Sequence, residues 1–436
     1  MPSRHFSQIP TLYCWVDLID PTSECGRAPL TSLLPSSGVC AWIRDEAMVG
    51  WGQAWSWQRG KDRPPLVEAG DNAAITETAR VWDLVREKAQ IHWSDGARKA
   101  WGSDLPTVPL AFVSCSFEDD GERCLIVPQF TIMTFGHQRF IVTASTNSQQ
   151  KPEFTAQIRH NKLPSHVECR PGSMGEEQWR DAVDQVIRAL RNREAGKVVM
   201  ARDLTITSDS AFDEAALVQS LHERYPQTWV FTVQGLIGAT PEMLVSLRDG
   251  HLHSRVLAGS CLPQDADKLP LSLKDRSEHL FAVESVVSAL LPVATDVQAP
   301  MRPDVLMLPN IAHLCSDVYA SFPQGSVLDA VAQLHPTAAV CGTPRTEALD
   351  LIHIHERVER GRYSGPVGWI DGKGNGEFGI ALRCAQLDKN RRTLRVFAGC
   401  GIMPDSSSRS EFEETQTKMR PIFDVVGLSI TTPTAE

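Results

Sequence analysis

Short apolar runs separated by turn-forming residues dominate the last quarter of the chain. Three such runs, at 366–370, 378–385 and 394–403, are separated by Asp371-Gly372, by a glycine-rich step at 374–376 and by a polar step at 388–390. This pattern predicts three strands of a β-meander. Apolar residues then recur at helical spacing from Phe412 to Val426, so we predict a helix capped by Ser410.

This predicted helix carries charged residues on one face. Glu411, Glu414 and Lys418 stand at i, i+3 and i+7, a spacing that in isolation is typical of a surface ion pair. Arg383 lies among apolar neighbours in the middle predicted strand, where an unpaired guanidinium is costly to bury. Together, these charges predict a site for a small anion that is held through a divalent metal.

Residues 1–170 read as a β-rich half with one helical insert. Strands are predicted at 39–43 and 47–52, which form a hairpin, and also at 110–117, 124–127 and 139–144, with a helix at 75–92. Residues 145–170 are polar and predict a connection between the halves. No constellation in this half indicates chemistry.

Residues 175–427 alternate helices with strands. A helix over 179–190 precedes a strand at 197–201, so Lys197 stands at a strand entrance. Ser272 caps a helix that runs to about 291 and presents Asp275 and Glu278 three residues apart. This pair mirrors Glu411 and Glu414. Two helices that each offer such a pair predict one Mg²⁺ site between them, because Mg²⁺ prefers hard oxygen ligands.

Two familiar patterns are set aside. Gly374-x-Gly376-x-x-Gly379 matches a dinucleotide fingerprint, but it lies between two predicted strands and opens no helix, so a β-turn is expected. His353 and His355 are two residues apart on a predicted helix and therefore face different directions, which argues against a shared metal.

Composition narrows the class of protein. The 436 residues are 42% hydrophobic and 22% charged, with a formal net charge of −10 and no dense Lys/Arg block, so neither nucleic acid nor an anionic membrane is expected as a partner. No apolar run is long enough to span a bilayer and no signal peptide is evident, which predicts a cytoplasmic protein. The 11 cysteines form no C-x-x-C pair, so reduced thiols are expected.

Nine ordered motifs together resemble the chorismate-utilising enzymes, a family that includes isochorismate, salicylate, anthranilate and aminodeoxychorismate synthases. The resemblance is specific over 175–427 and weaker over the first half. The motifs are Lys197-Val198-Val199, Thr240-Pro241-Glu242, Leu257-Ala258-Gly259-Ser260, Lys274-Asp275-Arg276-x-Glu278-His279, His335-Pro336-Thr337, Gly365–Trp369, Arg383-Cys384-Ala385, Ala398–Ile402 and Glu414-Thr415-x-x-Lys418.

The resemblance implies a fold as well as a function. The expected fold is α+β, a large single-domain sandwich in which two antiparallel sheets enclose the substrate cleft and helices lie outside. Residues 1–170 would form the N-terminal β-rich half of this sandwich, residues 175–427 the chorismate-binding catalytic region and residues 428–436 a tail.

Substitutions within the motifs separate the family members. Ala258 stands at the position where aminodeoxychorismate synthases use a lysine that bonds covalently to the substrate. Lys197 stands at a position where anthranilate synthases have no lysine. Water, not ammonia, is therefore the expected nucleophile, and no glutaminase subunit is expected. Ala339 stands where salicylate synthases tend to carry threonine. The chain thus looks most similar to isochorismate synthase, with salicylate synthase as the alternative.

A non-catalytic chorismate-fold binding protein is the alternative of a different class. The loss of a catalytic or metal-binding residue would indicate such a protein, but all are present. The resemblance implies an isomerase that acts as a monomer with Mg²⁺ and supplies menaquinone, siderophore or salicylate biosynthesis. Its implied site comprises Lys197 as base, Glu242 as acid, Glu278 and Glu414 as metal ligands, and Gly259, Ser260, Ala339, Arg383, Gly399 and Lys418 around the substrate.

Overall fold

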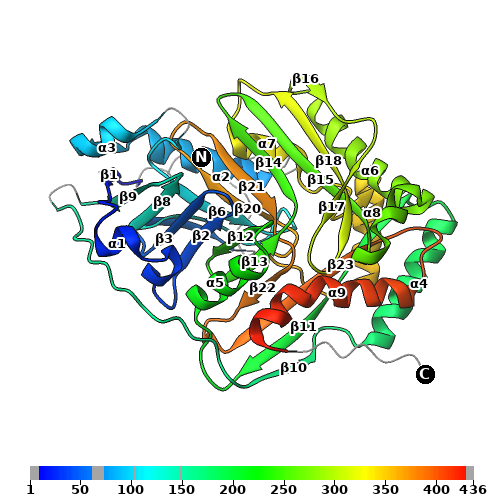
Figure 1. Ribbon diagram of the computed structural model, residues 1–436. Helices are drawn as coiled ribbons and strands as arrows, with labels where there is room; N and C mark the ends of the chain where they lie inside the picture. The colour runs from blue at the N-terminus through cyan, green and yellow to red at the C-terminus, as the bar shows by residue number, and fades with distance from the viewer. Residues whose placement is uncertain (1–8, 61–72, 103–104, 148–149, 429–436) are drawn as a thin grey trace.

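Two large β-sheets pack against each other and helices cover their outer faces (Figure 1). The computed structural model describes residues 9–60, 73–102, 105–147 and 150–428. Within these residues every strand pair is antiparallel except β1 with β5. The expected α+β sandwich of two antiparallel sheets is confirmed.

The larger sheet has 13 strands among the described residues. In spatial order they are β10 (Val167–Pro171), β11 (Lys197–Ser208), β23 (Thr393–Ile402), β22 (Cys384–Leu387), β13 (Leu236–Thr240), β12 (Trp229–Val233), β2 (Val39–Ile43), β3 (Ala47–Trp51), β8 (Phe130–Phe135), β9 (Gln138–Ser145), β1 (Tyr13–Leu18) and β5 (Gln90–Trp93), with β19 (Gly342–Thr343) beside β11.

The smaller sheet has 10 strands in the same described part of the chain. They are β16 (Thr295–Gln298), β18 (Ala312–Ser321), β15 (His251–Cys261), β14 (Met243–Arg248), β21 (Gly376–Ile380), β20 (Pro366–Ile370), β6 (Ala111–Cys115), β7 (Arg123–Val127) and β4 (Trp55–Arg59), with β17 (Asp304–Met307) beside β18.

The helices complete the layers. The α-helices are α1 (Glu24–Arg27), α2 (Ala73–Glu87), α3 (Asp95–Ala100), α4 (Glu176–Arg191), α5 (Glu214–Arg224), α6 (Leu273–Leu290), α7 (Val327–Leu334), α8 (Arg345–His355) and α9 (Ser408–Val426), and two 3-10 helices span Leu30–Leu33 and Pro263–Leu271. Within the described residues, none of these helices is both long enough and apolar enough to cross a membrane.

Alternation along the strands explains the two main apolar clusters. In β12, Phe231 and Val233 join the cluster shared by both sheets, whereas Val230 joins the cluster beneath α5 and α9. A residue period of two places successive side chains on opposite faces of the sheet, so β12 is covered on both sides. This double burial explains why the sequence of β12 is apolar along most of its length.

Strands from the first 170 residues complete both sheets. β2 pairs with β12 in the larger sheet, and β6 pairs with β20 in the smaller one. The two halves of the sequence are therefore parts of one interleaved structure. Of the expected tail at 428–436, all but Leu428 lies outside the described residues.

Several predicted elements are confirmed at their expected positions. β20 has the predicted bounds, the hairpin of β2 and β3 is present, and Lys197 is the first residue of β11. Two predictions were too long or misplaced. The helix predicted over 75–92 ends at Glu87 because residues 90–93 pair with β1 as strand β5, and α9 begins at Ser408, before the expected cap Ser410.

The prediction of one strand over 378–385 was wrong. The chain forms β21 in the smaller sheet, crosses to the larger sheet through Ala381-Leu382-Arg383, and continues there as β22. Arg383 therefore lies in this crossing, with a positive φ of 50°, and not within a strand. Because β21 and β22 are both largely buried, the apolar sequence pattern continues across the crossing and does not reveal it.

Candidate active site

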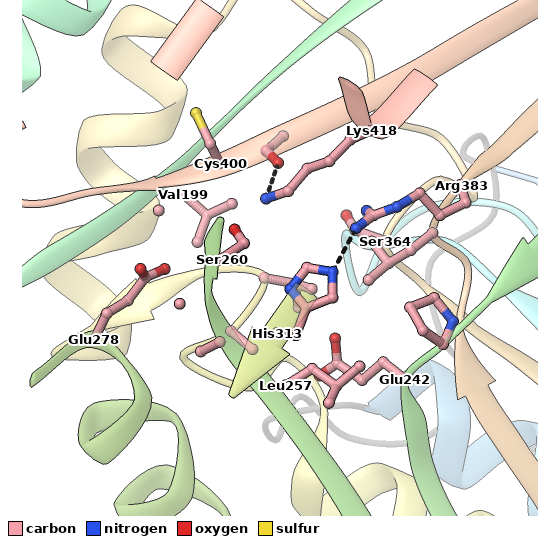
Figure 2. Close-up of a pocket in the computed structure, with 18 of the residues that line it drawn as sticks. Val199, Glu242, Leu257, Ser260, Glu278, His313, Ser364, Arg383, Cys400 and Lys418 are labelled. Atoms are coloured by element: carbon pink, nitrogen blue, oxygen red, sulfur yellow. Dashed lines mark hydrogen bonds between the residues drawn. The ribbon is translucent and has the colours of Figure 1, made fainter. Parts of the chain in front are cut away.

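A cavity lies where the two sheets meet, and most of the expected site residues line it. It encloses about 580 Å³, its open mouth included. Residues of β11 and β23 from the larger sheet and of β15 and β18 from the smaller one form its walls (Figure 2). The expected residues that line it are Glu242, Gly259, Ser260, Glu278, Ala339, Arg383, Gly399 and Lys418.

Two neighbouring crossings between the sheets place the acid and the arginine. The chain passes from β13 to β14 through Pro241-Glu242, and from β21 to β22 through the segment that ends at Arg383. The crossings are tied to each other, because the Ile380 amide donates to the Glu242 carbonyl oxygen at 3.2 Å and the Ala239 amide donates to the Arg383 carbonyl oxygen at 3.2 Å. The fold thus brings Glu242 and Arg383 to one wall.

Glu242 is in an environment that favours its protonated form. Its side chain is buried, and this burial raises the pKa of the Glu242 carboxyl to about 8, although the charges of Lys197, Arg383 and Lys418 oppose the change. A carboxylic acid with such a pKa holds its proton near neutral pH. Glu242 can therefore act as a proton donor, the role that the resemblance implies.

Lys197 lies behind the cavity wall beside Glu278. Its side chain is fully buried, and its Nζ is 3.1 Å from Oε1 of Glu278. The contact has the distance of an ion pair but not the geometry of a hydrogen bond, so within the described residues the Lys197 ammonium has no hydrogen-bond acceptor. Gly401 makes room for this pair, because a Cβ there would lie 2.2 Å from Glu278 Oε1.

Glu414 and Lys418 enter the site from one face of α9. Lys418 Nζ is 2.6 Å from Glu414 Oε1 and donates to the Gly399 carbonyl oxygen at 3.1 Å. The Ser260 hydroxyl donates to Glu414 Oε1 at 2.9 Å. Burial raises the pKa of Glu414, but Lys418 and Ser260 outweigh it and hold the pKa below its ordinary value. Glu414 is therefore a carboxylate at neutral pH.

Arg383 has a partner that the sequence did not indicate. Its Nη2 donates to Nε2 of His313 at 2.9 Å, across the cavity in Figure 2. Burial, aided by the charges of Arg383 and Lys418, lowers the pKa of His313 well below its usual range, so the imidazole is neutral. A hydrogen bond with the backbone of Gly259, the residue at the irregularity of β15, opposes this decrease of the pKa. His313 thereby links Arg383 to Gly259 in the cavity wall.

His313 could not be found from its sequence neighbours. It stands in an apolar strand, β18, and both of its partners lie far away in the chain. A buried histidine in such a strand is usually a core residue with satisfied hydrogen bonds. The only available signal was the polar residue itself among apolar neighbours.

The carboxylates of α6 and α9 gather near the mouth. Lys274 Nζ is 2.9 Å from Glu411 Oε1, and the charges of Glu411, Glu414 and Glu278 all raise the pKa of Lys274, which burial alone would lower. Glu278 and Glu414 also both raise the pKa of Asp275, on which burial acts most strongly. The two predicted acidic pairs therefore lie close enough to interact electrostatically.

These residues fit a Mg²⁺ ion that is completed by other ligands. Within the described residues, no group of three or more His, Cys, Asp or Glu side chains is arranged to hold a metal. Mg²⁺ in enzymes is commonly bound by one or two carboxylates together with waters and substrate oxygens. Glu278 and Glu414 offer such oxygens, each balanced by one lysine, and Gly401 keeps space beside Glu278.

The glycine motif at Gly374 and His353 of α8 have other structural roles than ligand binding. Residues 371–375 form the turn between β20 and β21, so the Gly374 motif is the expected β-turn. His353 Nε2 is 3.0 Å from Glu118 Oε1, whereas the nearby Glu356 pairs with Arg360 at 2.6 Å.

Comparison with known proteins identifies the family. Residues 57–427 match the model of the chorismate binding enzymes. The chain is 31% identical over 267 residues to the isochorismate synthase MenF of Bacillus subtilis, a match that covers 58% of this chain and 56% of that protein. It is 34% identical over 269 residues to the vibriobactin-specific isochorismate synthase of Vibrio cholerae, with 58% and 68% covered.

The match to the first of these relatives thus spans little more than half of that protein's length. A solved structure extends the likeness of the fold over the whole chain. The menaquinone-specific isochorismate synthase MenF of Escherichia coli superposes with a TM-score of 0.74 at 20% identity, covering 97% of both chains. Because the family model matches most of the sequence, this chain belongs to the chorismate binding enzymes.

Proposed function

We propose that this chain is an isochorismate synthase, which isomerises chorismate to isochorismate with Mg²⁺. One observation carries the proposal: Glu242, a carboxyl group with a pKa of about 8, lines the cavity, and Lys197, a fully buried lysine, lies behind the cavity wall beside Glu278. An acid and a base near one small-molecule site are what an exchange of hydroxyl groups requires. The similarity to isochorismate synthases supports the same assignment.

Two cations suit the substrate's charge. Chorismate is a dicarboxylate, and both Arg383 and Lys418 line the cavity. An arginine bonded to a neutral histidine keeps its full charge and the remaining N–H groups for an anion. Lys418 is already held toward the Gly399 carbonyl, so it is ordered before substrate arrives. Gly259 and Gly399 line the same cavity, which supports the proposal that their backbones approach substrate oxygens.

Glu278 and Glu414 would hold the Mg²⁺. When bound, the ion supplies positive charge that stabilises the substrate's ring carboxylate as electron density moves through the ring. Ser260 keeps the Glu414 carboxylate oriented through its hydroxyl. Asp275 and Glu411 would not bind the ion themselves. They would influence the charge and the orientation of the ligands Glu278 and Glu414.

Lys197 and Glu242 would divide the proton transfers. Lys197 accepts a proton from the water whose oxygen attacks C2, the ring double bonds shift, and the C4–oxygen bond breaks. Glu242 gives its proton to the departing hydroxyl, which leaves as water. The Glu242 carboxylate that results is stabilised by the charges of Lys197, Arg383 and Lys418, which lower its pKa even before substrate binds. Atoms therefore balance, and the product is an isomer of the substrate.

The enzyme would act without a glutaminase subunit and as a monomer. Its relatives are named after menaquinone and vibriobactin, so we expect its isochorismate to enter menaquinone or siderophore biosynthesis.

Product analysis tests the proposal. The protein is incubated with chorismate and Mg²⁺, with and without ammonia, and the products are separated by chromatography. We expect an equilibrium mixture of chorismate and isochorismate that ammonia does not change. Anthranilate in the presence of ammonia, or salicylate as the main product, would replace the assignment by another member of the family. Binding of chorismate without turnover would indicate a binding protein.

A further inference from the structure

A second groove lies along α9, away from the cavity between the sheets. It encloses about 550 Å³, its open mouth included, and residues from the β10–α4 connection, the start of α4, β11 and α9 line it. In Figure 1, α9 runs across the lower half of the molecule, with β10 and β11 below it and α4 to its right. None of the residues assigned above to chorismate or Mg²⁺ lines this groove. Its apolar wall comprises Met174, Leu204, Phe412, Met419 and Phe423.

The groove and the catalytic cavity use different faces of α9. Phe412, Met419 and Phe423 follow one stripe at i, i+7 and i+11. Glu414 and Lys418 follow another stripe, from which Lys418 lines the catalytic cavity and Glu414 contacts Ser260 in its wall. A ligand in the groove would therefore leave the chorismate site open.

One buried cation, Arg202, lines this apolar groove. Its residue is 4% exposed, its guanidinium lies over the Phe412 ring at 4.0 Å from the centroid, and its Nε donates to Thr415 Oγ1 at 2.6 Å. Within the described residues, no carboxylate lies within ion-pair distance of Arg202 and no acceptor takes a hydrogen bond from its two Nη groups, so the charges of Glu176 and Asp203 act on the guanidinium only from a longer distance. The neighbouring Asp203 is engaged by Arg395 at 2.6 Å.

The other buried arginines show how unusual this arrangement is. Arg123 and Arg360 pair with Glu77 and Glu356, and Arg362 donates to backbone carbonyl oxygens and to a glutamine side chain. Arg383 lacks a carboxylate partner, and it lines the catalytic cavity. Among these buried arginines of the described residues, Arg202 and Arg383 thus line a cavity without forming an ion pair to a carboxylate.

An unpaired buried charge destabilises a protein unless an anion compensates it. Burial lowers the pKa of Arg202 to about 10, so the guanidinium is charged at neutral pH. Two free Nη groups present parallel donors, the geometry that a carboxylate accepts with both oxygens.

The walls and the remaining charge define the ligand further. Phenyl rings and thioethers pack favourably against an aromatic ring. Glu176 is the one carboxylate among the lining residues, and its charge disfavours a second anionic group on the ligand. We propose that this groove binds a small aromatic monocarboxylate, with its carboxylate on Arg202 and its ring between Met174, Leu204 and Phe423.

Binding of 4-fluorobenzoate to the full chain, followed by ¹⁹F NMR, tests this site. We expect a saturable change in the ligand signal that excess chorismate does not reverse. Arg202→Gln should weaken binding roughly 10- to 100-fold, since it removes charge-assisted hydrogen bonds. Arg383→Gln is the matched control in the catalytic cavity and should leave binding unchanged. Loss of binding in Arg383→Gln, or displacement by chorismate, would place the ligand in the catalytic cavity and overturn the proposal.

Further variants keep the test independent of the Arg202–Thr415 contact. Leu204→Trp should fill the groove and abolish binding with Arg202 in place, whereas Glu176→Gln should tighten binding about two- to fivefold by removing a like charge. The neutral analogue 4-fluorobenzamide should bind at least tenfold more weakly than the acid. Equal binding of acid and amide, or unchanged binding in Leu204→Trp, would refute the site. None of these outcomes depends on whether the chain makes isochorismate.

Discussion

Replacing Glu242 by glutamine should change how the stability of the protein depends on pH. Glutamine has nearly the same shape but does not titrate. Because burial raises the pKa of Glu242 to about 8 from the ordinary 4.5, the folded protein keeps a proton that the unfolded chain has released at intermediate pH. The unfolding free energy of the parent should therefore fall as the pH rises between these two values.

The structure sets the size of this effect. The difference between 4.5 and about 8 corresponds to about 5 kcal/mol between the two protonation states. The glutamine variant has no titrating group at this position, so its unfolding free energy does not fall in this way. We expect the two proteins to have similar unfolding free energies near pH 5, where the native Glu242 is neutral, and the variant to be the more stable by up to about 5 kcal/mol above pH 8.

Urea denaturation followed by circular dichroism, in steps from about pH 5 to about pH 9, measures the difference. Glu414→Gln is the control from the same site. Lys418 and Ser260 hold the pKa of Glu414 below its ordinary value against the effect of burial, so its carboxylate is ionised in both the folded and unfolded states over this range. Its difference from the parent should stay constant with pH.

A constant difference between Glu242→Gln and the parent would refute the reasoning about burial. A variant that loses stability relative to the parent as the pH rises would show that Glu242 is ionised and salt-bridged in the folded state. Glu242 would then be unable to serve as the acid.

Three further predictions concern the catalytic cavity. Lys197→Met should lower turnover roughly 100-fold or more while calorimetry shows unchanged chorismate binding, and near-parental turnover would remove Lys197 from the mechanism. EDTA should abolish turnover, and added Mg²⁺ should restore it. Glu278→Gln should raise the Mg²⁺ concentration needed for half-maximal turnover. Turnover that does not depend on the metal would contradict the proposed Mg²⁺ site. Gly401→Ala should reduce turnover more than it reduces thermal stability. The added Cβ would lie 2.2 Å from Glu278 Oε1 and 2.7 Å from Lys197 Cε, so it would displace these two side chains. Normal turnover in this variant would show that the close packing at Gly401 is unimportant.

The sequence predicted local elements best where turn formers bound a short apolar run. β20 is found at its predicted residues, and Ser272 caps α6 by accepting from the Asp275 amide. Such signals are local, since they depend on glycine and proline dihedrals and on a side chain that bonds its own backbone.

Properties that depend on distant partners were not predictable. The passage of the chain between sheets at Arg383 leaves no glycine or proline signal, because the positive φ falls on an arginine. His313 acquires its role only through Arg383, which lies 70 residues further along the chain. Motif resemblance did indicate which side chains gather at the cavity, but not that Lys197 sits behind its wall or that Arg202 is left unpaired beside a different groove.

The interleaving of the two halves has a consequence for how the chain folds as it is synthesised. Ser114 in β6 pairs with Val367 in β20. At a synthesis rate of roughly 5–20 residues per second, the intervening stretch of about 250 residues takes on the order of 12–50 s to emerge. For that time an apolar strand of the nascent chain lacks its neighbour and exposes an open hydrogen-bonding edge. The newly made first half is therefore a natural client for chaperones, and the high contact order of the finished sheets predicts slow folding.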